Sequence, residues 1–156
     1  MIKLKPFKQS KGYCGPACLK MVLSAYGINK SERYLAKTTK SSRTGGCYEK
    51  DMIKAAEEFN LTGYVKQKSS IKELKQLIKR GIPAIVDWFS PEEAGHYSVV
   101  VGFERNKIIL ADPHFGQLKK HKIDWFEERW FDMPFNEDIR IKEIIVILNQ
   151  SSLRDS

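Results

Sequence analysis

Residues 9–27 read Gln9-Ser-Lys-Gly-Tyr-Cys14-Gly-Pro-Ala-Cys-Leu-Lys-Met-Val-Leu-Ser-Ala-Tyr-Gly27, and this stretch carries both a helix and a candidate nucleophile. Pro16 at the predicted first helical position and Gly27 just beyond the last turn are typical of helix start and stop signals. The apolar residues between them recur at helical spacing and predict one buried stripe, formed by Leu19, Val22, Leu23 and Tyr26. Cys14 therefore lies at the start of an amphipathic helix.

That position favours a reactive thiol. A helix N-terminus carries unpaired N–H groups and about +0.5 of an elementary charge, which favours thiolate over thiol. The chain turns sharply at Gly15-Pro16, so the thiol of Cys14 can project toward a cleft. The alternative interpretation is a small buried hydrophobe, as most free cysteines are. Cys18 shares a helix face with Cys14 but lacks metal-site or Cys-x-x-Cys spacing, so we predict that it is core, and nothing near Cys47 suggests a base for that thiol.

A base and a group to orient it occur far downstream, in Gly-His96-Tyr-Ser-Val-Val-Val-Gly and Leu-Ala-Asp112-Pro-His. Asp112 can accept a hydrogen bond from the imidazole of His96, which would fix the tautomer of the ring; the alternative is an aspartate that caps a turn before proline. His114 is the rival base but lies in a turn, and His121 is predicted to be solvated within a lysine run. Gln9 can donate its side-chain N–H to a developing oxyanion, together with the backbone N–H of the nucleophile.

The remaining pattern predicts helices first and strands second, which is an α+β fold with a mostly antiparallel sheet. Further helices are expected over about 32–38, capped by Ser31, over roughly 47–59, and after the capping box Ser70–Glu73, closed by Gly81. The helix over roughly 47–59 is expected to bury Tyr48, Met52, Ala55, Ala56 and Phe59. Strands are expected at Ile82–Phe89, His96–Phe103, Lys107–Asp112, Gln117–Ile123 and Arg140–Asn149. Leu61–Val65 is a short strand or an extended link, Asp124–Phe131 a short helix or turn, and Gln150–Ser156 a frayed tail.

Length and composition predict one domain, spanning residues 1–156 with its core over about 9–149. The chain is 42% hydrophobic and 29% charged, which is ordinary for a globular protein. No apolar run approaches the roughly 20 residues of a membrane helix, and no secretory signal is recognisable. Three cysteines are an odd count for a disulfide framework and suit a reducing compartment, so we predict a cytoplasmic protein. No ligand set for a metal or cofactor is found.

The formal net charge of +8 raises the question of nucleic acid. The lysines are spread along the chain, however, and no RNA-binding motif with interleaved aromatic residues is present. We therefore predict a solvated basic surface and no nucleic-acid partner. Such a surface favours acidic peptide segments.

The order Gln9, Cys14, His96, Asp112 resembles that of the papain-like cysteine peptidases. More narrowly, Tyr-Cys-Gly-Pro-Ala-Cys-Leu and the two later motifs resemble the bacteriocin-processing peptidase family over about residues 9–116. Members of that family cut secretion leaders after a double glycine, usually as the N-terminal part of an ABC exporter. The resemblance implies a papain-like fold, with Cys14 as nucleophile, His96 as base, Asp112 as the group that orients it and Gln9 as oxyanion donor.

Three departures qualify the implied substrate. Gln9 lies one position closer to Cys14 than is usual in the family, Tyr13 stands where exporter-linked members often have an acidic residue, and no membrane span or Walker A motif follows. We therefore expect a free-standing relative: a cysteine peptidase acting on a peptide or leader-like segment. The alternatives are an inactive peptide-binding domain of the same fold, or an acyltransferase or transpeptidase in which an amine replaces water at the same thiol.

Overall fold

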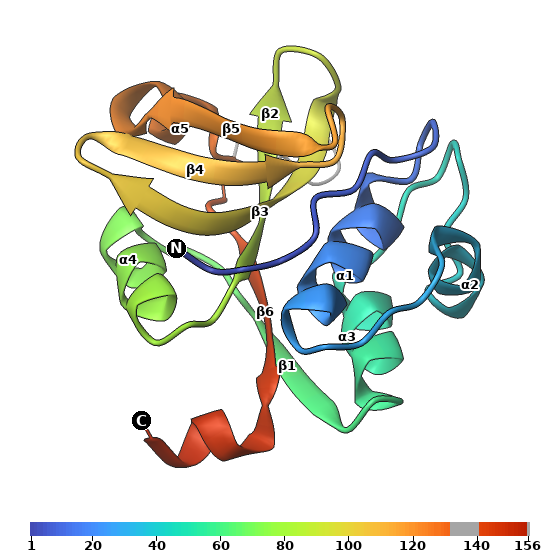
Figure 1. The fold of residues 1–156 in the computed structure, drawn as a ribbon. Coiled ribbons are helices and arrows are strands. Elements are labelled where there is room, and N and C mark those ends of the chain that lie inside the picture. The colour runs from blue at the N-terminus through green and yellow to red at the C-terminus, as the bar shows by residue number, and fades with distance from the viewer. Residues whose placement is uncertain (132–140, 156) are drawn as a thin grey trace.

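The computed structural model describes residues 1–131 and 141–155 (Figure 1). The helices are α1 (Cys14–Ala25), α2 (Glu32–Thr38), α3 (Glu49–Glu57), α4 (Ile71–Lys79) and α5 (Ile123–Arg129). The strands are β1 (Leu61–Lys66), β2 (Ala84–Ser90), β3 (Ala94–Glu104), β4 (Lys107–Asp112), β5 (Gln117–Lys122) and β6 (Ile144–Asn149). A 3₁₀ helix, η2 (Gln150–Asp155), follows β6. The predicted α+β class is confirmed.

The strands form one sheet in which every described pairing is antiparallel. The order is β1-β6-β2-β3-β4-β5, so the last strand in the chain is inserted between β1 and β2. Figure 1 shows β2 to β5 curling together, while β1 and β6 extend away from them. A register shift between Val100 and Gly102 lets β3 bend where it pairs with β4.

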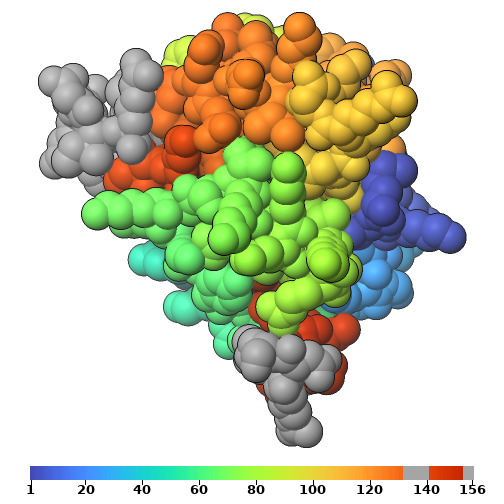
Figure 2. Space-filling model, turned by 90° about the vertical axis from the view of Figure 1, so that its left-hand side faces the viewer, coloured from blue at the N-terminus to red at the C-terminus, as the bar shows by residue number. Residues whose placement is uncertain are grey.

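Helices cover both faces of this sheet, and each face has its own core. α1, α2 and α3 gather on one side (Figure 1), where the buried cluster includes Leu19, Val22, Leu23, Met52, Val99 and Ile145. The other cluster lies under α4 and α5 and includes Leu74, Leu77, Trp88, Leu110, Phe126 and Val146. In Figure 2, α4 (green) occupies the middle of the face that it covers, below the yellow and orange residues of β4 and β5. Because successive side chains along β3 and β4 point to opposite faces of the sheet, these two strands contribute residues to both clusters.

Local signals explain the helix ends. The side chains of Ser31 and Ser70 accept hydrogen bonds from the N–H groups of Tyr34 and Glu73, as predicted for N-caps. Gly27 follows the C-cap of α1 with φ of +77°, a conformation that glycine adopts without a steric penalty. The start of α1 differs, because no side chain caps it.

The N-terminal segment crosses from one side of the molecule to the other before α1 begins. The N–H of Ile2 donates to the carbonyl of Val101 in β3 at 2.8 Å, and the N–H of Gln9 donates to the carbonyl of Pro113 at 2.8 Å. Both bonds attach the segment to the sheet. Figure 1 shows the same path, with the dark-blue trace running beside β3 toward α1.

Some expectations were wrong in detail. α3 begins at Glu49 rather than near residue 47, and Tyr48 is 65% exposed, because it precedes the helix and lies outside its buried stripe. The predicted frayed tail is instead the 3₁₀ helix η2 over Gln150–Asp155. Of the two alternatives for Leu61–Val65, the strand is confirmed; it spans Leu61–Lys66 and pairs with β6. The predicted strand from Arg140 begins outside the described residues. None of the helices in residues 1–131 and 141–155 is long and apolar enough to cross a membrane.

Candidate active site

The structure brings His96 and Asp112 together at one end of the sheet. Val99 lies opposite Ala111, so one step outward places Asp112 across from Ser98 and diagonal to His96, on the same face. His96 Nε2 lies 2.8 Å from Asp112 Oδ1, and the two side chains are 0% and 1% exposed. A carboxylate only accepts hydrogen bonds, so Nε2 carries a proton and donates a hydrogen bond to Asp112 Oδ1.

The turn after β4 holds the Asp112 carboxylate in place. The backbone N–H of His114 donates to the same Oδ1 atom at 3.0 Å, and the N–H of Gly116 donates to the carbonyl of Asp112 at 2.8 Å. The carboxylate therefore receives one fixed backbone donor besides the imidazole. This second hydrogen bond fixes the orientation of the Asp112 side chain relative to His96.

Trp88 shields this pair, and the sequence analysis missed it. The residue lies opposite His96 in the β2–β3 ladder, is fully buried, and packs its ring 6.2 Å from the imidazole. Its Nε1 donates to Ser98 Oγ at 3.0 Å, which fixes the indole. Excluding water strengthens the His96–Asp112 hydrogen bond. The sequence does show a tryptophan in the predicted strand before the one that carries His96. Only the pairing register of the two strands, however, reveals that Trp88 lies opposite His96.

The environment of His96 favours the imidazolium. Burial alone would lower the pKa of His96, but the hydrogen bond and charge of Asp112, together with the interaction with Cys14, raise it to about 9. Nε2 is engaged by Asp112, while Nδ1 is buried and has no hydrogen-bond partner among the described residues. Nδ1 is therefore the nitrogen left to face the Cys14 thiol.

Cys14 opens α1 and is half-buried, with a free thiol. Its N-cap residue, Tyr13, makes no side-chain capping bond. Within the described part of the chain, no backbone or side-chain acceptor binds the N–H of Cys14 or of Gly15. These donors are available to an anion at the mouth of the helix.

Gln9 lies beside the Asp112 turn. Its backbone bond to Pro113 anchors it there, and Gly116 permits the approach because a Cβ at that position would lie 2.7 Å from the Cβ of Lys8. The side-chain Nε2 makes only a long 3.4 Å hydrogen bond to the carbonyl of Ser10. The amide is therefore close to the site and weakly engaged.

Residues 41–47 form a loop that packs directly on the start of α1. A Cβ on Gly15 would lie 2.5 Å from Cys47 Cβ, and a Cβ on Gly12 would lie 2.2 Å from the carbonyl oxygen of Arg43. Tyr97, next to the histidine, donates from its hydroxyl to the carbonyl of Cys47 at 3.2 Å. The loop is thus a wall of the site, joined to both the helix and the sheet.

The other two cysteines are less suited to nucleophilic chemistry. Cys18 is fully buried, as predicted, and burial raises the pKa of its thiol well above the usual value, with further increases from Cys14 and Asp112. Burial also raises the pKa of Cys47, although hydrogen bonds with Ser41 and Thr39 oppose part of the increase. A raised pKa lowers the thiolate fraction near neutral pH.

The other histidines have different partners. His114 Nδ1 lies 2.7 Å from Glu93 Oε1, and its ring meets the His96 ring edge-on at 6.5 Å. It therefore joins the β2–β3 and β4–β5 turns beside the site. His121 is not solvated as predicted: its ring stacks on Trp125 at 4.7 Å, and burial lowers its pKa.

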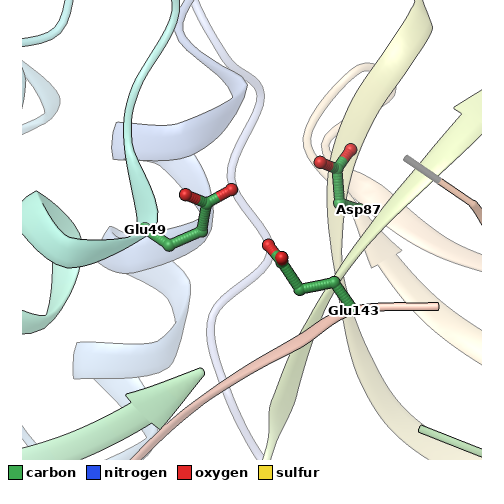
Figure 3. Close-up of side chains that lie close together, drawn as sticks. All are labelled: Glu49, Asp87 and Glu143. Atoms are coloured by element: carbon green, nitrogen blue, oxygen red, sulfur yellow. The ribbon is translucent and has the colours of Figure 1, made fainter. Parts of the chain in front are cut away.

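One group of carboxylates has the proximity of a metal site. Glu49, Asp87 and Glu143 come from three separate parts of the chain and converge in Figure 3, with ligand atoms within 4.8 Å of one another. Oxygen-only ligands suit hard cations such as Ca²⁺ or Mg²⁺. Tyr97 Oη lies 3.1 Å from Glu49 Oε1, so its single proton is shared between this carboxylate and the carbonyl of Cys47. Glu143 is buried and the other two residues are partly buried, but proximity alone does not define a metal site, and no metal is assigned to these carboxylates.

Comparisons with known proteins identify the family of the chain. The family model for the Peptidase C39-like family matches residues 1–136. The Transport/processing ATP-binding protein ComA of Streptococcus pneumoniae is 33% identical over 122 residues, which are 75% of this chain and 16% of ComA. This chain therefore matches only about a sixth of that relative.

Solved structures show the same fold. The crystal structure of the peptidase domain of Streptococcus ComA has a TM-score of 0.74 and 24% identity, covering 96% of this chain and 100% of that one. A double glycine motif protease from an AMS/PCAT transporter, solved in complex with the leader peptide, has a TM-score of 0.76 and 20% identity, covering 96% and 94%. The sequence match over most of the chain and the shared fold place this chain in the Peptidase C39-like family.

Proposed function

We propose that the protein is a cysteine peptidase that hydrolyses peptide bonds through Cys14, His96, Asp112 and Gln9. One observation carries the proposal: a buried His96–Asp112 hydrogen bond leaves the opposite ring nitrogen for a thiol at an uncapped helix N-terminus. A cysteine, a base and a group that orients the base are the parts of a nucleophilic acyl-transfer site.

The reaction begins with the thiolate of Cys14 and the imidazolium of His96. Sulfur attacks the scissile carbonyl, a C–S bond forms, and the carbonyl π electrons move to oxygen. The oxyanion accepts hydrogen bonds from the backbone N–H of Cys14 and from Gln9 Nε2. His96 Nδ1–H then protonates the departing amine as the C–N bond breaks, which leaves a thioester.

Hydrolysis uses the same groups in the reverse roles. The neutral imidazole of His96 removes a proton from water, the hydroxide adds to the thioester carbonyl, and the tetrahedral intermediate expels the thiolate. Asp112 stabilises the imidazolium in both halves of the cycle without taking its proton. If an amine enters in place of water, the product is a new amide, which is the transferase alternative.

We propose a peptide or leader-like substrate with small residues before the cut. Two similarities support this substrate class: the sequence match to ComA, and the shared fold with a protease solved with its leader peptide. The loop of residues 41–47 packs closely on Gly12 and Gly15, on either side of Cys14 in the sequence, and we infer that it limits the space for large side chains there.

An electrophilic peptide probe tests the proposal. A Gly-Gly vinyl sulfone should label wild-type protein on Cys14, as mapped by mass spectrometry of the digest, and should not label Cys14→Ala. Incubation of wild type with a peptide library then separates the reactions: free acids at the new C-terminus indicate hydrolysis, and amides with an added amine indicate transfer. Failure to label Cys14, with no new termini in the library, would overturn the assignment in favour of an inactive binding domain.

A further inference from the structure

We propose that a cationic pocket beside the nucleophile is a subsite for an acidic side chain of the substrate peptide, near the scissile bond. The cationic pocket is the cavity of about 460 Å³ bordered by Ser10, Tyr13, Glu32, Arg33, Lys37 and Arg43. This inference rests on the proposed peptidase function, because it identifies the substrate class of the same site.

The position of the pocket ties it to the reaction centre. Tyr13 borders the pocket and directly precedes Cys14, so their Cα atoms are about 3.8 Å apart. Arg43 belongs to the loop that packs on Gly12 and Gly15. Since an extended peptide advances about 3.3 Å per residue, a side chain within two residues of the cut can reach the pocket.

The charges of the pocket favour a carboxylate. Arg33 and Lys37 are exposed and four residues apart on α2, so they project from the same side of that helix. In the described part of the chain, no ion pair joins Arg33, Lys37 or Arg43 to an acidic residue. Three cations thus border one cavity without a carboxylate partner.

The single acidic residue that borders the pocket is already engaged. Glu32 Oε2 accepts from the backbone N–H of Ser10 at 2.8 Å, and its Oε1 accepts from Ser10 Oγ at 2.6 Å. These bonds hold Glu32 against the segment that leads into α1. Its carboxylate is therefore used for structure.

Arg43 is arranged to receive a ligand. Its Nη1 donates to the carbonyl of Lys11 at 2.7 Å, and its guanidinium lies 4.3 Å from the centre of the Tyr13 ring. These contacts restrict the side chain and use few of its five N–H donors. A restrained guanidinium with free donors suits two-point binding of a carboxylate better than lysine does.

Binding separates this proposal from catalysis. Fluorescent peptides built from small residues would carry one glutamate or one glutamine, placed in turn at each of the two positions on either side of the expected cut, all with amidated C-termini. Fluorescence anisotropy with the Cys14→Ala protein measures their affinities. We expect one position at which glutamate binds about tenfold more tightly than glutamine at low salt, with the difference shrinking at high salt.

Variants assign the effect to the pocket. Arg43→Ala should abolish the difference, and Lys37→Gln, which alters no described hydrogen bond, should reduce it. Lys72→Ala removes one exposed lysine from α4, on the other side of the sheet, and should leave the difference unchanged. Equal affinities for glutamate and glutamine peptides at every position, or a difference that survives Arg43→Ala, would overturn the proposal.

Two further measurements distinguish a side-chain subsite from a site for the chain end, and distinguish failure of the pocket proposal from failure of the peptidase proposal. If glutamine peptides with a free C-terminal carboxylate show the same gain over their amides, the pocket recognises a chain end and the side-chain assignment is wrong. Wild-type turnover of both series is measured in parallel. Cleavage without a glutamate preference leaves the peptidase and removes the pocket's role, whereas glutamate-selective binding without any cleavage leaves the pocket and removes the peptidase.

Discussion

The two sides of the candidate site are built in opposite ways. On the sheet side, His96 and Asp112 are almost completely buried, joined by a 2.8 Å hydrogen bond and packed against Trp88. On the helix side, Cys14 is half-buried at the start of α1, which no side chain caps. It lies beside the exposed loop of residues 41–47 and the cationic pocket. Under the proposed function, this difference assigns proton transfer to the rigid sheet side and contact with the substrate to the more open helix side.

Removal of the base should give the largest effect on the sheet side. We expect His96→Ala to abolish measurable turnover, because Cys14 loses both its proton acceptor and the cation that stabilises the thiolate. It should also lower the free energy of unfolding by about 1–3 kcal/mol, because Asp112 is left buried without its main partner. Peptide turnover and urea denaturation measure the two effects.

His114→Ala is the matched control, because His114 contacts Glu93 and lies outside the proposed proton path. We expect a much smaller loss of turnover than for His96→Ala. A reversed order would move the base to the exposed histidine and contradict the assignment of the sheet side.

Substitutions at Asp112 should lower turnover less than His96→Ala does, and the loss should depend on whether the new side chain can still accept a hydrogen bond. In serine proteases, loss of the carboxylate that orients the catalytic histidine lowers kcat about 10⁴-fold. We expect a smaller loss for Asp112→Asn, because its amide oxygen can still accept from His96 Nε2, and a larger loss for Asp112→Ala. The values of kcat for both variants measure the difference. Wild-type activity in both would reduce Asp112 to a residue that shapes the turn before Pro113.

The pH dependence should report the buried pair. Because the folded-state pKa of His96 is raised to about 9, turnover should fall as pH rises through about 9, where the imidazolium is lost. The free energy of unfolding should also fall as pH rises. The stabilising contribution of His96 is complete below its ordinary pKa of about 6.5 and is lost as pH rises from there to about 9. Urea midpoints from pH 6 to 10 for wild type and His96→Gln measure this, and parallel curves would contradict the raised pKa.

Cysteine reactivity should give the smallest of these differences and tests the helix side. We expect iodoacetamide to modify Cys14 about tenfold faster than Cys47 near neutral pH, since burial raises the pKa of Cys47, and Cys18 to react only on unfolding. Rates come from mass spectrometry of quenched samples. Equal rates at Cys14 and Cys47 would show that the helix start does not activate its thiol.

The sequence predicted what local rules determine. Ser31, Ser70 and Gly27 signalled helix ends, and β-branched runs located β2, β3 and β4. These signals depend on neighbours in the chain, so a single sequence contains them. The likeness of the motifs at Cys14, His96 and Asp112 to a known family supplied the roles that spacing alone left open.

Contacts between segments far apart in the chain could not be predicted from the sequence. The contact of residues 41–47 with Gly12 and Gly15 joins segments about thirty residues apart, and no periodic pattern encodes it. The shielding by Trp88 depends on strand register, which the sequence does not specify. The cationic pocket likewise combines the segment before α1, helix α2 and a loop, so its charges come together only in the folded chain.

The N-terminal segment sets a limit on how far the two sides can separate. Gln9 is bonded to the sheet side at Pro113, and Cys14 begins the helix side, so five residues connect them. Even fully extended, such a tether spans at most about 18 Å. The walls that hold Cys14 and Asp112 therefore cannot move far apart, and a substrate has to bring its scissile bond to a site whose width changes little.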